Sequence, residues 1–210
     1  MWKELSAKWQ TAFEEAWTAF RLGNIPIGAA VFDRSGNLLV REHNRTSEPD
    51  QINRKIAHAE TNALRRLNSE TCDLKSVVLY TTMEPCPMCM GTAVMSNIRH
   101  LRYAARDPYC GCADRMSELP YIRSKSEDYR HTGGEPELVQ LVLQSYYELK
   151  RTGQGSCNPI LEKFREINSQ AVMTAAALLK HQTLDAFAAD NTDFSFIYDE
   201  ILRFAKDSGI

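Results

Sequence analysis

The sequence predicts an α/β fold in which helices cover both faces of a mixed sheet. Helical and strand patterns follow one another in the order α-β-β-α-β-α-β, and one more strand and several helices come after them. Two of the expected strands are joined through a helix, and such a crossover makes its flanking strands parallel. Of the 210 residues, 43% are hydrophobic, which is enough for a buried core.

Each element is expected from a local pattern. From Trp2 to Phe20, apolar residues recur at steps of three or four, which is typical of an amphipathic helix, and the pattern ends near Gly23. The turn residues over 33–37 indicate a hairpin. The later elements are expected, in order, as strands over 27–32 and 38–40, a helix over 57–67, a strand over 77–81, a helix over 86–96, strands over 98–104 and 138–143, and helices over 144–151, 160–180 and 194–206.

Two further segments differ from these patterns. Residues 107–134 are rich in loop residues, and the run from Gly153 to Pro159 is the clearest break in the chain. We therefore expect a body over residues 1–152 and a helical C-terminal extension over 153–210 that packs on the body or on a partner subunit. This extension has five basic and eight acidic residues.

Two short motifs carry the chemistry: His58-Ala59-Glu60 and, further along, Pro85-Cys86-Pro87-Met88-Cys89. Their pattern, H-x-E followed by P-C-x-x-C, is that of zinc-dependent nucleobase deaminases. Catalytic zinc takes three protein ligands and leaves one position open for water. We expect His58, Cys86 and Cys89 to be these ligands.

Glu60 is the expected proton shuttle between the water, the ring and the departing ammonia. Residues at positions i and i+2 of a regular helix do not share a face. His58 and Glu60 therefore reach one site only if His58 lies at the very start of its helix.

A structural zinc site is the alternative interpretation of these motifs, and such sites have four protein ligands. Candidate fourth ligands are Cys110, Cys112, Cys72 and His43. The presence of Glu60 beside the ligands argues for the catalytic interpretation.

With these motifs the chain resembles the cytidine and deoxycytidylate deaminase superfamily, in the branch of guanine deaminases, bacterial tRNA adenosine deaminases and yeast-type cytosine deaminase. The resemblance runs from about residue 1 to 150. It implies a three-layer α/β/α sandwich around a mixed five-stranded sheet, with the helical extension added. Its matching segments are Ile25–Ala30, His43–Arg45, His58–Glu60, Thr81–Gly91 and, more weakly, Ala104–Asp107.

The resemblance also implies substrate contacts and a homodimer with the active site near its interface. The side-chain amide of Asn44 is expected to contact the base, and the backbone N–H of Ala59 to reach a ring acceptor. Asp107 is expected at the pocket mouth. Asn44 and Asp107 are also common turn residues, which is their structural alternative. The backbone carbonyl of Glu84 is a further candidate, as acceptor for the substrate amine.

The expected reaction is hydrolytic deamination of a free nucleobase or nucleoside, with an aminopurine such as guanine as the first hypothesis. A tRNA-specific adenosine deaminase is the alternative. It is less favoured because the net charge of −2 and the acidic extension offer little attraction for RNA. A zinc-binding scaffold subunit without turnover is the second alternative.

The expected location is the cytoplasm, because Cys86 and Cys89 must be reduced thiolates to bind zinc. The charged N-terminal run does not have the pattern of a signal peptide. Contiguous apolar stretches are shorter than the roughly 20 residues of a membrane span, so no membrane partner is expected.

Overall fold

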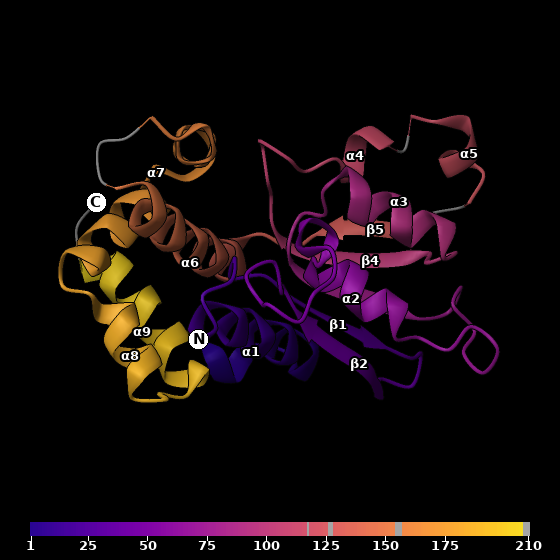
Figure 1. Cartoon of the computed structure of the whole chain (residues 1–210), viewed down its shortest axis with the longest axis horizontal. Coiled ribbons are helices and arrows are strands. Elements are labelled where there is room, and N and C mark those ends of the chain that lie inside the picture. The colour runs from indigo at the N-terminus through magenta and orange to yellow at the C-terminus, as the bar shows by residue number, and fades with distance from the viewer. Residues whose placement is uncertain (117, 126–127, 154–156, 208–210) are drawn as a thin grey trace.

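The computed structural model describes residues 1–116, 118–125, 128–153 and 157–207 (Figure 1). Within these residues one sheet has the strand order β2-β1-β3-β4-β5. β1 is antiparallel to β2 and β3, and β3, β4 and β5 run parallel. The mixed five-stranded sheet and the parallel pair around the second-motif helix are thus confirmed. The strands are β1 Gly28–Phe32, β2 Leu38–His43, β3 Val78–Met83, β4 His100–Ala105 and β5 Asp128–His131.

The described helices follow most of the expected patterns, with small shifts at their ends. Leu5 has an extended backbone (φ −70°, ψ 140°), so the first expected helix divides into a 3-10 turn and α1. α8 was not expected from the sequence. The helices are α1 Ala7–Arg21, α2 Ala59–Arg65, α3 Pro87–Met95, α4 Ala113–Met116, α5 Pro120–Arg123, α6 Gly134–Thr152, α7 Pro159–Lys180, α8 Thr183–Ala189 and α9 Phe194–Asp207, with 3-10 turns at Trp2–Glu4 and Arg54–Ile56.

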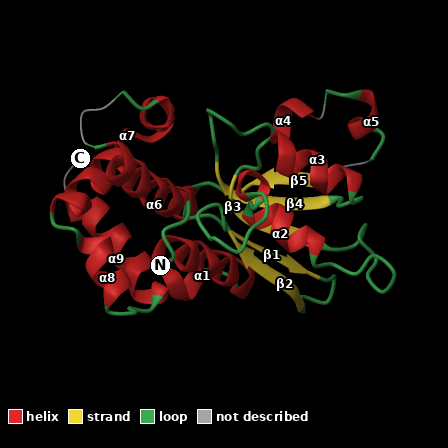
Figure 2. Cartoon of the chain, viewed as in Figure 1, coloured by secondary structure: helices red, strands yellow, loops and turns green. Residues whose placement is uncertain are grey.

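Two buried clusters lie on opposite faces of the sheet, as the side-chain alternation of β1 shows. Ala30 and Phe32 belong to the cluster that α1 and α6 build, whereas Ala29 and Val31 belong to the one that α2 and α3 build. Figure 2 shows these helices on their two sides of the strands. The fold is therefore the expected three-layer α/β/α sandwich.

Gly28 lets α1 lie directly against the first strand. A Cβ atom at this position would lie 2.1 Å from the carbonyl oxygen of Ala12 and 2.4 Å from the amide nitrogen of Ala16. The Gly28 amide donates to Thr82 Oγ1 over 3.2 Å, and Gly28 pairs with His43 across the hairpin. This close packing positions the end of β2, from which Asn44 follows.

The fifth strand was predicted in the wrong place. Residues 138–143 lie in α6, and the edge strand is β5, within the segment expected to be a loop. The stretch from Val139 to Leu143 is buried without interruption because α6 packs between the sheet and α7. A continuous apolar run has no period, so the sequence pattern does not separate a buried strand from a buried helix.

The C-terminal helices contribute to the same core as α1 and α6. Phe164 of α7 and Tyr198 of α9 are fully buried, and the ring of Tyr198 lies 5.6 Å from that of Phe13 in α1. The boundary between residues 152 and 153 stays a prediction, and the Gly153–Pro159 break lies partly outside the described residues. None of the described helices is both long enough and apolar enough to cross a membrane.

Replacing Phe164 with alanine is expected to lower the free energy of unfolding by about 3–5 kcal/mol, because a buried aromatic ring is lost and a cavity remains. Urea denaturation followed by circular dichroism measures the change. The matched control is Phe196→Ala, because Phe196 is 51% exposed. A loss below about 1 kcal/mol in Phe164→Ala would contradict the placement of α7 in the core.

Candidate functional site

His58 and Glu60 reach the same site because the helix starts between them. His58 is the N-cap of α2, with an extended backbone (φ −78°, ψ 152°), and Glu60 lies in the first turn. The extended N-cap turns the imidazole back over the helix start. The Glu60 side chain is buried, with 4% of the residue exposed. This is the arrangement that the spacing of the motif required.

The two cysteines lie at the start of α3 in a similar way. Cys86 is the N-cap, also extended (φ −71°, ψ 168°), Pro87 opens the helix, and Cys89 lies in the first turn. Proline is well suited to this position because the first N–H groups of a helix have no intrahelical partner. The Sγ atoms of Cys86 and Cys89 each lie 3.6 Å from Nδ1 of His58.

These three side chains fit a zinc ion. Ligand nitrogen and sulfur atoms at about 2.1 and 2.3 Å from one tetrahedral ion lie about 3.6 Å apart. All three ligand atoms lie within 4.8 Å of one another, and no other such cluster occurs in the described residues. Two thiols and an imidazole are also ligand types that zinc prefers.

Proton sharing within the cluster also suits a cation. The hydrogen bond from Cys89 and the contact with His58 lower the pKa of Cys86 to about 4 against the effect of burial, while the hydrogen bond with Cys86 and burial raise the pKa of Cys89. The hydrogen bond with Cys86 raises the pKa of His58, and burial raises that of Glu60. One thiolate therefore forms readily at this place.

None of the candidate fourth protein ligands belongs to this cluster within the described residues. Cys112 Sγ points to the carbonyl oxygen of Pro85 at 3.7 Å, and both ring nitrogens of His43 contact carboxylates. Cys72 lines a separate surface depression, whereas Cys110 lines the cavity beside the cluster. The cluster thus offers three ligand atoms to a metal ion and has one side open to the pocket, as catalytic zinc sites do.

A cavity of about 200 Å³ lies on this open side. Most of the surface that faces the cavity is apolar, and the polar residues that line it come from separate elements, which is typical of a small-molecule site. The lining residues are Ile25, Ile27, Asn44, His58, Glu60, Met83, Glu84, Cys86, Asp107, Tyr109, Cys110, Gln144, Glu148 and Ile160.

Asn44 offers a donor to this cavity. Its Oδ1 accepts hydrogen bonds from the amide and the hydroxyl of Thr46, over 3.0 and 2.7 Å. Its Nδ2 has no hydrogen-bond partner among the described residues and remains available. Asn44 is therefore a turn residue and a pocket residue at once. The backbone N–H of Ala59, at the first helical position of α2, is a second donor without an intrahelical partner.

The loop after β4 is held by the carboxylate of Glu84. Its two oxygens accept from the amides of Asp107 and Ala113, over 3.1 and 3.0 Å. A Cβ atom at Gly111 would lie 2.4 Å from Glu84 Cδ, so glycine is needed for this approach. The side chain of Glu84 thus has a structural role, which leaves its backbone carbonyl for the expected substrate contact.

Asp107 lines the cavity and also shapes its own turn. Its Oδ1 accepts from the amides of Tyr109 and Cys110, over 3.0 and 2.9 Å. Burial raises the pKa of the Asp107 carboxyl. Asp107 is thus a turn former that also lines the cavity, and its contact with a substrate stays a prediction.

Sequence reasoning missed the wall that α6 and α7 supply. Gln144 and Glu148 of α6 and Ile160 of α7 line the cavity. Oε2 of Glu148 accepts from Asn158 Nδ2 at 3.0 Å, and Oε1 of Gln144 has no partner among the described residues. Together with Gln140, these residues form a buried polar row at four-residue spacing. If residues 138–143 had been predicted as part of a helix, the four-residue spacing of these polar residues would have indicated a common face.

A buried ionic network lies directly beside Asn44. His43 is 6% exposed, and its Nδ1 and Nε2 contact carboxylates of Glu15 and Glu48 at 3.2 and 3.0 Å. Both ring nitrogens act as donors to carboxylates only when the imidazole is charged. Burial lowers the pKa of His43, but its two acidic partners raise it more, so the net shift is upward. The network fixes the end of β2 and hence the backbone of Asn44.

Comparisons with known proteins place this site in a family. A model of the cytidine and deoxycytidylate deaminase zinc-binding region matches residues 3–105. The tRNA-specific adenosine deaminase of Bacillus subtilis (strain 168) is 36% identical over 137 residues, covering 63% of this chain and 77% of that protein. The tRNA-specific adenosine deaminase of Rickettsia felis is 30% identical over 149 residues, which cover 66% of this chain and 97% of that protein. The chain therefore belongs to the cytidine and deoxycytidylate deaminase family.

Solved structures show the same similarity. One from a study of A-to-I editing by tRNA:A34 deaminases at the wobble position of transfer RNA has a TM-score of 0.51 and 30% identity, covering 60% of this chain and 96% of that one. Guanine deaminase from Nitrosomonas europaea has a TM-score of 0.53 and 25% identity, and the match covers 67% of this chain and 82% of that one. The protein is thus a zinc-dependent hydrolase of the nucleobase and nucleoside deaminase class. The tRNA-specific adenosine deaminases among these relatives are more similar in sequence to this chain than the guanine deaminase is.

Cys86→Ser and Cys89→Ser are each expected to lose zinc, because each removes one of three protein ligands. Metal analysis of purified protein by mass spectrometry measures the zinc per chain. Cys157→Ser is the matched control, since Cys157 is an exposed thiol far along the chain. Full zinc content in both ligand variants would refute the assignment.

His43→Gln is expected to lower the free energy of unfolding by about 1.5–3 kcal/mol at pH 6, because hydrogen bonds to charged groups are lost. The folded pKa of His43 lies above its ordinary value of 6.5. The stabilisation is therefore complete below pH 6.5 and declines as the pH rises through the folded pKa. Urea denaturation from pH 5.5 to 9, with exposed His181→Gln as control, measures the difference. A difference that grows with pH would contradict a charged His43.

Proposed function

We propose that the protein deaminates adenosine in tRNA, releasing ammonia and leaving inosine. The observation that carries the chemistry is the cluster of His58, Cys86 and Cys89 with Glu60 beside it, open to a cavity of about 200 Å³. A single planar base can enter a cavity of this size. The choice of adenosine in tRNA is supported by the similarity to tRNA-specific adenosine deaminases.

Glu60 moves the protons of the proposed reaction. Zinc, when held by the three ligands, supplies a Lewis acid that lowers the pKa of water from about 16 to about 7. Glu60 accepts a proton from the attacking water and donates it to the ring nitrogen next to the amine. It then helps the amine to leave as ammonia, so that water supplies the new oxygen. Burial raises the pKa of Glu60, and the protonated form needed as a donor is thereby accessible.

Three backbone and side-chain groups orient the base in this proposal. The Nδ2 of Asn44 and the N–H of Ala59 donate to ring acceptors, and the carbonyl of Glu84 accepts from the amine that leaves. Asp107 lies at the cavity mouth, where it meets the sugar side of the substrate. These groups come from four different segments, so they fix both the position and the tilt of the ring.

Local charge supports an RNA substrate better than the net charge does. Arg54 and Lys55 are exposed on the turn that leads into α2, and Arg65 and Arg66 are exposed at its other end. These four cations lie around the helix that carries Glu60, although the chain as a whole has a net charge of −2. Basic side chains beside a base pocket attract the phosphate backbone.

The expected homodimer remains a further proposal.

Deamination of a free aminopurine is the second candidate, and the α6 wall favours it. Glu148 and Gln144 both line the cavity. Oε2 of Glu148 already accepts from Asn158 and Arg151, whereas Oε1 of Gln144 is a buried acceptor without a partner among the described residues. Adenosine in RNA has no ring N–H, because N9 is bonded to the ribose. A free purine has such a group and could satisfy one of these acceptors. Ile160 also narrows the cavity on the side of the extension.

Wild-type protein is expected to form inosine in a tRNA anticodon stem-loop and to release less ammonia from adenine, guanine, adenosine and cytosine. Glu60→Gln is expected to keep zinc and fold while the turnover rate falls by about 10²–10⁴-fold, because the proton shuttle is lost. Ammonia release and nucleoside analysis measure both. Arg34→Gln, an exposed change in the β1–β2 turn, is the control.

The outcomes of this assay separate the candidates. Turnover of free purines without inosine in the stem-loop would favour the second candidate. Zinc binding without turnover of any substrate would favour the scaffold alternative. Unchanged turnover in Glu60→Gln would remove Glu60 from its proposed role.

A further inference from the structure

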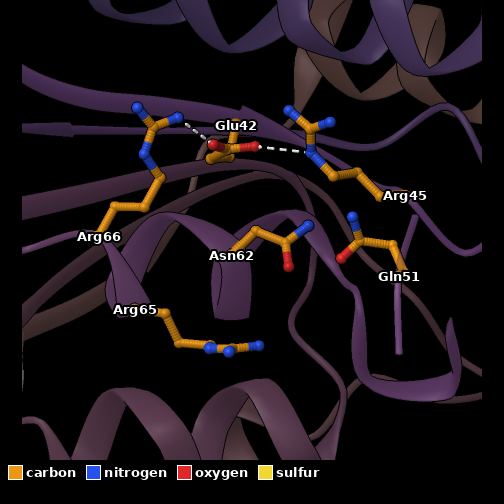
Figure 3. Close-up of a pocket in the computed structure, with 6 residues that line it drawn as sticks. All are labelled: Glu42, Arg45, Gln51, Asn62, Arg65 and Arg66. Carbon is orange, nitrogen blue, oxygen red and sulfur yellow. Dashed lines mark hydrogen bonds and ion pairs between the residues drawn. The ribbon is translucent and has the colours of Figure 1, made fainter. Parts of the chain in front are cut away.

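A second depression lies at α2, separate from the deaminase cavity. It has a volume of about 280 Å³ and is lined by Glu42, Arg45, Gln51, Asn62, Arg65 and Arg66. Figure 3 shows Arg45 and Arg66 on either side of Glu42, with Arg65 across the depression from them. Three guanidinium groups, two amides and one carboxylate make this a strongly polar site, which we call the arginine pocket.

Positive charge dominates the arginine pocket. Glu42 accepts from Arg45 Nε at 3.1 Å and also pairs with Arg66, so this one carboxylate is shared by two cations. Arg65 has no ion-pair partner within the described part of the chain. Arg45 also pairs with Glu48 at 2.8 Å, so Arg65 is the guanidinium of the arginine pocket that remains unpaired. The amide of Gln51 faces the same space (Figure 3).

The arginine pocket is joined to the deaminase site by Asn62. Its Nδ2 donates to the carbonyl oxygens of His43 and Ala57, over 3.1 and 3.2 Å. These two residues come immediately before Asn44 and His58. Arg65 lies five residues after Glu60, which is about 7.5 Å along the helix axis. Because five residues also turn the helix by about 140°, the arginine pocket lies on a different face of α2 from Glu60, so only a substrate that extends beyond the base can reach both sites.

We propose that the arginine pocket binds a phosphate group of the substrate, beside the nucleotide whose base is deaminated. The guanidinium fork matches phosphate oxygens in a bidentate way, and an amide adds a further donor. This proposal rests on the proposed function, since a polynucleotide carries phosphates on both sides of the target nucleotide. It assigns part of the RNA contact to α2, away from the acidic extension.

The test measures binding of a fluorescein-labelled tRNA anticodon stem-loop by anisotropy, from 50 to 300 mM salt, in a Glu60→Gln background that prevents turnover. Arg65→Gln is expected to weaken binding about threefold to tenfold and to reduce the slope of log K against log salt by about 0.7–1, as for one lost phosphate contact. Arg34→Gln is the matched control and is expected to leave both quantities unchanged. Two competitors, AMP and inorganic phosphate, are titrated in parallel.

Each outcome decides between sources of the phosphate or overturns the proposal. An Arg65-dependent slope with RNA assigns the arginine pocket to the polynucleotide backbone. If Arg65→Gln weakens the binding of AMP but not of the RNA, the arginine pocket binds the phosphate of a mononucleotide, and this result contradicts the tRNA function. An unchanged slope and unchanged AMP binding in Arg65→Gln would overturn the arginine pocket even if the wild type forms inosine in RNA. A loss of dimer by sedimentation velocity, with the slope unchanged, would assign the face to a subunit contact and also overturn it.

Discussion

The site depends on two helices that begin side by side, each with a metal-binding side chain as its N-cap. His58 and Cys86 both have an extended backbone, so each side chain turns toward the common start of α2 and α3. Each motif places one more side chain at the site from the first helical turn: Glu60 in α2 and Cys89 in α3. Helix N-termini also carry partial positive charge, which favours a thiolate and holds it near the metal. A shift of either helix start by one residue would separate these groups.

Short-range patterns predicted the parts of the molecule that are determined locally. The hairpin, the parallel crossover and the start of α2 follow from turn residues, from helix length and from the two-residue spacing of His58 and Glu60. The wall of the cavity was not predicted, because Gln144 and Ile160 reach it only through the packing of α6 and α7 on the sheet. The edge strand β5 was missed for a related reason. Its residues are polar, three of the four are half-buried and Arg130 is exposed, and the apolar run after it is a helix.

Charge is distributed unevenly over the fold, and the net charge of the whole chain does not show this. The net charge of −2 includes an acidic C-terminal extension that lies away from α2 (Figure 1). Around α2, Glu42 is shared by two arginines while Arg65 is unpaired. Within about one Debye length, near 8 Å at physiological salt, it is the local charge that a ligand senses. Substrate attraction must therefore be judged at the cavity and not from the isoelectric point.

The polar row of Gln140, Gln144 and Glu148 links selectivity to stability. These side chains are buried within a helix that also forms the centre of the larger core. Gln140 Nε2 is satisfied by the carbonyl of Pro26 at 2.9 Å, whereas Gln144 lines the cavity and its Oε1 is buried without a partner among the described residues. A substitution in α6 that adapts the cavity to another base also changes the packing of the core behind this helix. Relatives with new specificities should thus differ in the α6–α7 contact as well as in the cavity, and their preferences should change in steps that carry a cost in stability.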